Sequence, residues 1–157
     1  MTTDQRKRAL DILSAALRAV DPVEAVRRHM VRQDGALRVG SATINLSEIE
    51  RIFVVGCGKA GATMASAVEG ILDDSVADGW VNTKYGHSAA ASPTKRIVVH
   101  ESGHPVPDQS GVSGTQRIMS LAEQAGARDL VICLISGGGS ALMTAPAPGL
   151  TLDDKQA

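Results

Sequence analysis

Residues 51–61 read RIFVVGCGKAG, and this stretch decides the class of fold. It begins with an uninterrupted apolar run, which is typical of a strand buried on both faces of a sheet. Three glycines follow, and a helical pattern then extends over residues 60–72. Glycines between a strand and a helix let backbone amides approach an anion near the positive end of the helix dipole. We therefore predict a βα unit in which Gly56 and Gly58 face a phosphate or carboxylate group.

Lys59 adds a positive charge to this glycine turn. A cation at the mouth of a phosphate cradle can neutralise charge that develops during phosphoryl transfer, so Lys59 is the candidate catalytic residue. The alternative is a tight turn that needs glycine only for packing, with Lys59 in solvent. We expect Cys57 to fill space inside the turn, because no base is spaced to activate it as a nucleophile.

A second glycine-rich stretch, SGGGS over residues 136–140, follows an apolar run over residues 129–135. Three consecutive glycines are costly to order, and they make sense where the backbone must come close to a ligand. The two serines add hydroxyl donors. We predict that this loop binds an anion, and the alternative is a loop packed against a neighbouring helix. The candidate binding residues are Ser136, Gly137, Gly138, Gly139 and Ser140.

Four short apolar runs are separated in part by helical patterns; they cover residues 51–55, 79–81, 96–100 and 129–135. This succession is typical of βαβ crossovers and predicts an α/β fold with a doubly wound, mostly parallel, Rossmann-like sheet. In the strand order 3-2-1-4 the first and fourth strands are neighbours, and the switch point lies between their carboxyl ends. The two glycine stretches would then flank one crevice and hold two anionic groups side by side.

A third motif, ESGHPVPD over residues 101–108, leaves the carboxyl end of the third predicted strand. His104 and Asp108 could overlook the same crevice, and we include His104 among the candidate binding residues. Asp108 could instead cap the next helix, and His104 could simply fix a proline-rich turn. Both interpretations stay open at this point.

The chain before residue 51 has a different texture. Apolar residues at helical spacing predict a helix over residues 3–20. Asp21 and Pro22 are a good cap and a good first residue for a second helix, which we expect to run to about residue 32. Two alternating stretches, over residues 36–39 and 42–46, predict a small β-hairpin.

The end of the sequence predicts the start of another helix. TLDD over residues 151–154 resembles a capping box, and only three residues follow it. A helix this short has little reason to form alone, so we expect a chain cut off before its fold is complete. We divide the chain into an N-terminal helical segment with a hairpin, residues 1–50, and a partial Rossmann-like domain, residues 51–157.

Composition excludes several classes of protein. The net charge of −1 leaves no basic surplus for a nucleic-acid backbone, and aromatic residues make up only 2%, too few for base stacking. No apolar run approaches the length of about 18 residues that a membrane helix needs. The two cysteines lack the spacing of a disulfide scaffold or a zinc site. We expect a cytoplasmic protein that binds neither nucleic acid nor membrane.

Two nucleotide-binding patterns are absent from the glycine turn. A dinucleotide site needs an acidic residue at the end of the second strand, and Asn82, Thr83 and Lys84 stand there instead. A Walker A loop needs four residues between its glycines and a serine or threonine after its lysine, and neither condition holds. The sequence therefore argues against an NAD site and against a P-loop.

Three stretches together resemble the MOFRL-type glycerate 2-kinase family, whose members are also named hydroxypyruvate reductases. They are VVGCGKAG at residues 54–61, GHPVPD at residues 103–108 and ISGGGSAL at residues 135–142. The resemblance implies transfer of the γ-phosphate of ATP to the 2-hydroxyl of D-glycerate, giving 2-phosphoglycerate, with Mg²⁺. It maps the lysine of the GxGKA motif onto Lys59 and the family's glycine loop onto residues 136–140.

The same resemblance implies a longer protein, with a smaller C-terminal domain and the active site in the cleft between the domains. No residue of this chain is assigned to a metal. An NAD(P)H-dependent hydroxypyruvate reductase is the alternative enzyme, and an inactive anion-binding fragment is the alternative without catalysis. An apolar face left by missing parts could also make the chain a homodimer.

Overall fold

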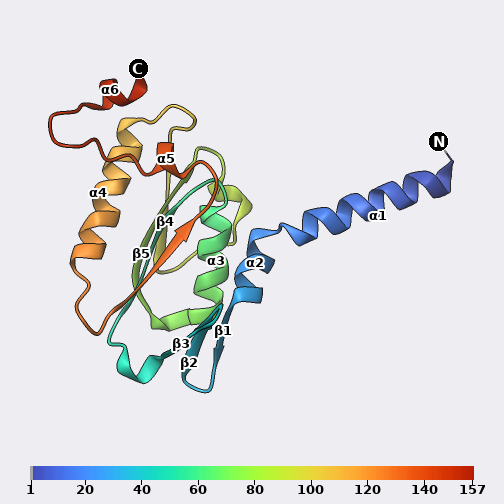
Figure 1. The fold of residues 1–157 in the computed structure, drawn as a ribbon, viewed down its shortest axis with the longest axis horizontal. Coiled ribbons are helices and arrows are strands. Elements are labelled where there is room, and N and C mark those ends of the chain that lie inside the picture. Colours follow the sequence, from blue (N-terminus) through green and yellow to red (C-terminus); the bar gives the residue numbers. More distant parts are fainter. Residues whose placement is uncertain (1) are drawn as a thin grey trace.

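A four-stranded parallel sheet organises the second part of the chain in the computed structural model, which describes residues 2–157 (Figure 1). The strands lie in the order β6-β5-β4-β7. Their bounds are β4 Ile52–Cys57, β5 Val76–Lys84, β6 Ile97–Ser102 and β7 Leu130–Ile135. β4 pairs in parallel with both β5 and β7. The predicted α/β class and the strand order 3-2-1-4 are confirmed.

Helices cover both faces of this sheet. α3 (Gly61–Leu72) packs on one face, and α4 (Gln109–Glu123) packs on the other (Figure 1). All six residues of β4 are buried, as expected of a strand with helices on both sides. Alternate residues of β4 enter two separate clusters: Phe53 and Val55 join Ile118 and Leu121 of α4, while Ile52 and Val54 join Val68 and Leu72 of α3.

Two helices and a small antiparallel sheet precede β4. α1 (Thr3–Ala19) and α2 (Pro22–His29) come first, and Asp21 caps α2 by accepting a hydrogen bond from the Glu24 amide. Three strands follow in the order β1-β2-β3. They are β1 Met30–Gln33, β2 Ala36–Val39 and β3 Ala42–Asn45, and the turn η1 Leu46–Glu48 leads to β4.

The predicted second helix is too long, because α2 ends at His29 rather than near residue 32. Residues 30–33 instead pair with β2 across a turn at Asp34 and Gly35, whose φ angles are +53° and +76°. Positive φ at both central residues is what a two-residue hairpin requires, and an Asp-Gly pair supplies it. The predicted hairpin of β2 and β3 is confirmed, with β1 as a third strand.

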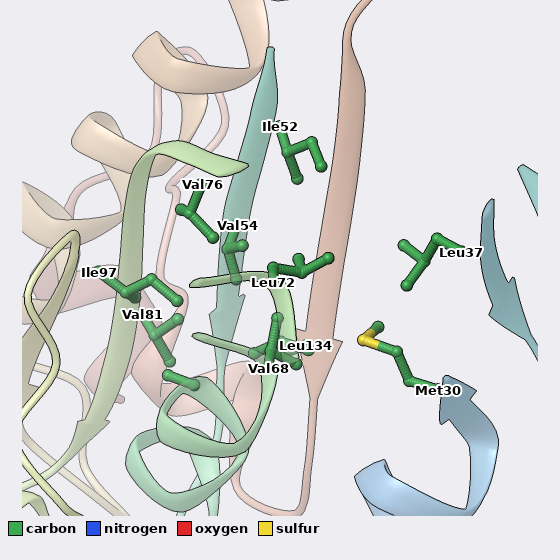
Figure 2. Close-up of a cluster of buried hydrophobic side chains, with 11 residues drawn as sticks. Met30, Leu37, Ile52, Val54, Val68, Leu72, Val76, Val81, Ile97 and Leu134 are labelled. Carbon is green, nitrogen blue, oxygen red and sulfur yellow. The ribbon is translucent and has the colours of Figure 1, made fainter. Parts of the chain in front are cut away.

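The small sheet shares its core with the parallel sheet (Figure 2). Met30 and Leu37 are buried, and they belong to the same apolar cluster as Ile52, Leu72 and Leu134. One core therefore extends across residue 50. The division of the chain at this residue stays a prediction, and it has a direct test.

Leu37→Ala should destabilise the whole fold by about 2–5 kcal/mol, because it leaves a cavity in the shared core. Chemical denaturation followed by circular dichroism measures this change. Val39→Ala is the matched control on the same strand, because Val39 is 36% exposed and should change the free energy of unfolding by about 0.5 kcal/mol or less. Two unfolding steps, with only the first shifted by Leu37→Ala, would show instead that residues 1–50 unfold separately.

The remaining helices lie outside this core. α1 has no buried residue and projects away from the rest of the fold (Figure 1). The turns η2 (Asp73–Ser75) and η3 (Ser88–Ala90) flank β5, and the short helices α5 (Gly139–Leu142) and α6 (Leu152–Gln156) end the described chain. Among residues 2–157, no helix is both long and apolar enough to cross a membrane.

Candidate functional site

The two glycine stretches lie side by side at one edge of the parallel sheet. β4 and β7 stay paired up to Cys57 opposite Ile135, so both chains leave the sheet at the same end. The Ser136 amide then donates to the Cys57 carbonyl at 3.0 Å, which carries the pairing one residue further. The predicted neighbourhood of the two stretches is therefore confirmed, at the switch point of the sheet.

The amides of the first glycine turn are already bonded within the chain. The Gly58 amide donates to the Asn82 carbonyl at 3.0 Å, and the Lys59 amide donates to the Gly137 carbonyl at 2.9 Å. The Ala60 amide donates to the Ser136 hydroxyl at 3.0 Å. These three amides are therefore occupied by acceptors of the chain itself, and an anion would have to replace those acceptors to bind them.

Gly56 and Gly58 serve close packing between the strands. A methyl group on Gly56 would overlap the Leu134 carbonyl, and one on Gly58 would overlap Ser136. Gly58 also has a φ of +129°, which side chains rarely adopt. These two glycines therefore have a packing role, because they let β4 and β7 approach each other; their contact with a ligand stays a prediction.

The carbonyl groups of the same turn are also held. The Thr83 hydroxyl donates to the Gly58 carbonyl at 3.1 Å, and His87 Nδ1 lies 3.1 Å from the Lys59 carbonyl. The backbone of Lys59 is thus fixed through both its amide and its carbonyl, while its side chain is exposed. This arrangement presents one ammonium group from a rigid support.

The second glycine stretch differs from the first in that the amides of its three glycines are not hydrogen-bonded within the described chain. Within the described residues, the amides of Gly137, Gly138 and Gly139 donate to no acceptor of the chain. Gly138 has a φ of +91° and precedes α5. The Ser136 hydroxyl accepts a hydrogen bond from the Ala60 amide of the first turn, and its own proton remains available to a ligand. Of the two glycine stretches, only the second therefore has free amides among the described residues.

Lys59 and His104 approach the same residue of this loop. A methyl group on Gly138 would lie 2.8 Å from His104 Nε2 and 3.5 Å from Lys59 Cε. His104 Nδ1 is buried and has no partner among the described residues. An unpaired buried nitrogen calls for an explanation, and no group of the described chain supplies one. The structure thus brings the predicted lysine and histidine together over the predicted loop.

A cavity of about 350 Å³ opens beside His104 and Gly138. Ser140 lines it, together with Lys155, which belongs to none of the three sequence motifs. α6 brings Lys155 there, because the Gln156 side chain donates to the Pro107 carbonyl at 2.6 Å. The capping box predicted α6, but no sequence signal shows where a five-residue helix docks. The complete lining is His104, Pro105, Pro107, Gly138, Ser140, Ala141 and Lys155.

Asp108 caps a helix and does not face this cavity. It accepts a hydrogen bond from the Gly111 amide at 2.8 Å at the start of α4, and another from the Tyr85 hydroxyl at 2.8 Å. Partial burial would raise the pKa of Asp108, but amide bonds from Gly103 and Gly111 and the Tyr85 hydroxyl together hold it below its usual range. Of the two open interpretations, helix capping holds for Asp108.

Cys57 fills space inside the turn. It is buried, and a methyl group on Gly139 would lie 3.0 Å from its sulfur. Burial raises the pKa of the Cys57 thiol, so the group stays protonated and unreactive near neutral pH. The expectation of a packing role agrees with this environment.

A family assignment follows from comparison with known proteins. Residues 8–157 match the family described as "Domain of unknown function (DUF4147)". The chain belongs to this family. Because the match covers all four strands of the parallel sheet, the DUF4147 domain includes both glycine stretches and His104.

Relatives of this DUF4147 chain include named kinases. It is 38% identical over 151 residues to the glycerate 2-kinase of Pyrococcus horikoshii, and 34% identical over 151 residues to the D-glycerate 2-kinase of Thermotoga maritima. Each alignment covers 96% of this chain, and 33% and 32% of the respective relatives. A protein of Agrobacterium vitis named "Putative hydroxypyruvate reductase" is 48% identical over 107 residues, which is 68% of this chain and 27% of that protein.

Two solved structures share the fold of the DUF4147 chain. A protein from Pyrococcus horikoshii gives a TM-score of 0.84 at 37% identity over 98% of this chain. A glycerate kinase from Thermotoga maritima gives a TM-score of 0.78 at 32% identity over 99% of it. In both, the matched part is 34% of the solved chain, so this chain spans about a third of the length of these relatives. The resemblance to glycerate 2-kinases is confirmed.

Metal ligands are not assembled in this part of the DUF4147 fold. Residues 2–157 contain no group of three or more His, Cys, Asp or Glu side chains that could hold a metal ion. Hard cations such as Mg²⁺ prefer several carboxylate or carbonyl oxygens. The side chains gathered at the site are instead Lys59, His104 and Lys155, a set suited to anions.

Proposed function

We propose that this chain is the N-terminal part of a cytoplasmic, ATP-dependent glycerate 2-kinase. The proposed reaction transfers the γ-phosphate of ATP to the 2-hydroxyl of D-glycerate and gives 2-phosphoglycerate. The observation that carries the proposal is the approach of Lys59 and His104 to Gly138, above a loop with free amides. The kinase names of relatives that are 38% and 34% identical support the same reaction.

Each residue of the site has a distinct task in this proposal. The Lys59 ammonium binds the transferring phosphoryl group and stabilises the negative charge on its oxygens. The amides of Gly137, Gly138 and Gly139 donate to an anionic oxygen of the substrate, either carboxylate or phosphate. His104 Nε2 faces the same glycine and orients the group bound there. Ser140 and Lys155 line the adjoining cavity and contact the rest of the glycerate.

The site has groups that suit the phosphates of ATP, but no residue of it is assigned to Mg²⁺. The cationic side chains and free amides fit the phosphates of a nucleotide. No cluster of metal ligands occurs among residues 2–157, so we assign no Mg²⁺ ligand to them and derive no step through the metal. When bound to ATP, Mg²⁺ supplies neutralisation of phosphate charge.

The test is an assay of the intact protein with ATP, Mg²⁺ and D-glycerate. Release of ADP measures turnover, and ³¹P NMR of the product distinguishes 2-phosphoglycerate from 3-phosphoglycerate. The proposal predicts ADP release that depends on glycerate, with 2-phosphoglycerate as the product. An intact protein that turns over no glycerate, or that forms only the 3-phosphate, would contradict it.

A hydroxypyruvate reductase is the second candidate, since relatives from Agrobacterium vitis carry that name. β5 ends at Lys84, and no acidic side chain follows at the position that would bind the ribose hydroxyls of NAD. This absence favours the kinase. Oxidation of NAD(P)H with hydroxypyruvate, without ADP release from ATP and glycerate, would reverse the preference.

The proposed partners are glycerate, a nucleotide and a second copy of the chain. β7 is an edge strand of the parallel sheet, and it leaves Ile135 65% exposed. An exposed apolar edge favours association with another surface, and a homodimer is one such association. Sedimentation velocity of the chain would show a dimer, and a monomer at all concentrations would remove this proposal.

A further inference from the structure

The turn that follows β5 holds the carbonyl group of Lys59. His87 lies in this turn, and its Nδ1 is 3.1 Å from the Lys59 oxygen. A carbonyl oxygen can only accept, so Nδ1 must carry the proton. The contact therefore requires a proton on His87 Nδ1, within reach of the Lys59 carbonyl oxygen.

A single carboxylate oxygen fixes the residues on both sides of His87. Glu101 Oε1 accepts hydrogen bonds from the Gly86 amide at 3.0 Å, the Ser88 amide at 3.1 Å and the Ser88 hydroxyl at 2.6 Å. Glu101 stands on β6, directly opposite Thr83 of β5. The Ser88 hydroxyl and the two amides also hold the pKa of Glu101 below its usual range, so the side chain is ionised at neutral pH.

Other hydrogen bonds also reach this turn. The Tyr85 amide donates to the Ser102 carbonyl at 3.2 Å, the Tyr85 hydroxyl donates to Asp108, and the His87 amide donates to the Lys84 carbonyl at 3.0 Å. Tyr85 is 53% exposed, Gly86 is exposed, and neither belongs to an apolar cluster of the described chain. The turn therefore contributes little to the core, and Glu101 is the one acceptor among the described residues that binds it on both sides of His87. Loss of the carboxylate would leave three donors without their acceptor and would release His87 from the Lys59 carbonyl.

We propose that Glu101 is a positioning residue for Lys59, acting through the turn of residues 86–88 and the hydrogen bond from His87. The inference rests on the proposed function for the role of Lys59. Glu101 itself touches no reacting group. It keeps the backbone of Lys59 still from the carbonyl side, while the bond from the Lys59 amide to Gly137 holds the other side.

Four variants of the intact protein test this chain of contacts. Glu101→Ala and His87→Ala should each lower kcat by about 10- to 100-fold, because small misplacements of a catalytic group are costly. KM should change by about twofold or less in both variants, since neither Glu101 nor His87 binds substrate. Glu101→Gln keeps an oxygen that can accept the same three bonds, and it should restore most of the wild-type kcat. The double variant Glu101→Ala/His87→Ala should lose no more than either single variant, because both act on one contact.

The control variant is Glu123→Ala, at an exposed end of α4, which should leave kcat unchanged. Additive losses in the double variant would overturn the proposal. Equal losses in Glu101→Ala and Glu101→Gln would also overturn it, since they would point to the charge rather than to the accepted bonds.

A second measurement does not depend on turnover. ¹⁵N NMR of the histidine ring should show the Nδ1–H tautomer for His87 in the wild-type protein and in Glu101→Gln, and should show its loss in Glu101→Ala. An unchanged His87 spectrum in Glu101→Ala would refute the positioning role even if the variant lost activity. A wild-type protein that shows the tautomer but phosphorylates no glycerate would refute the proposed function and leave the structural link intact.

Discussion

Lys59→Met should lower kcat for glycerate phosphorylation by about 10²- to 10³-fold, the usual effect of removing one charge-stabilising group from a transition state. In this structure the substitution should leave the backbone of residue 59 in place. The amide and the carbonyl of Lys59 are both bonded, and neither bond involves the side chain. Methionine keeps the length of the apolar stem and removes only the ammonium group. The fold should therefore be unchanged while the chemistry is lost.

The measurement is steady-state kinetics of ADP release, with circular dichroism as a check on folding. Lys95→Met is the matched control, because Lys95 is an exposed lysine whose side chain makes no ion pair within the described residues. It should change kcat by about twofold or less. A Lys59→Met enzyme that keeps more than about a tenth of wild-type kcat would exclude Lys59 as the group that stabilises the transition state.

The strand order could be predicted from the sequence because local signals were sufficient. The run from Ile52 to Val55 is apolar at every position, which identifies a strand covered on both faces. Glycine stretches directly after the first and fourth runs place both ends at the switch point of a doubly wound sheet. No contact between distant side chains was needed for this step.

The bonding of the glycine turns could not be predicted, because the partners lie far away in the chain. The amide of Gly58 is bonded to Asn82, and that of Ala60 is bonded to Ser136, 76 residues later. A glycine motif predicts that the backbone comes close to something, without telling whether that is a ligand or a neighbouring strand. The first turn approaches strand β7, and only the second keeps free amides.

Gly138→Ala should lower kcat because it displaces His104 from the second glycine loop. Gly138 has a φ of +91°, and a side chain in this left-handed region costs about 1–2 kcal/mol. The added methyl group would also lie 2.8 Å from His104 Nε2 and 2.9 Å from its Cδ2, closer than carbon and ring atoms can pack. His104 must therefore move away from the site. We expect kcat to fall by about 10²-fold, together with the modest loss of stability.

Gly137→Ala is the control that makes this result specific. An added methyl group at Gly137 meets nothing nearer than Lys59 Cε at 4.0 Å, an ordinary contact. Its φ is not in the left-handed region, so alanine fits without strain. This variant should keep its stability, and its kcat should be about tenfold higher than that of Gly138→Ala. Steady-state kinetics and thermal unfolding of the two variants measure both effects. Equal losses would mean that the methyl groups block the substrate itself, and that the placement of His104 is not what Gly138 protects.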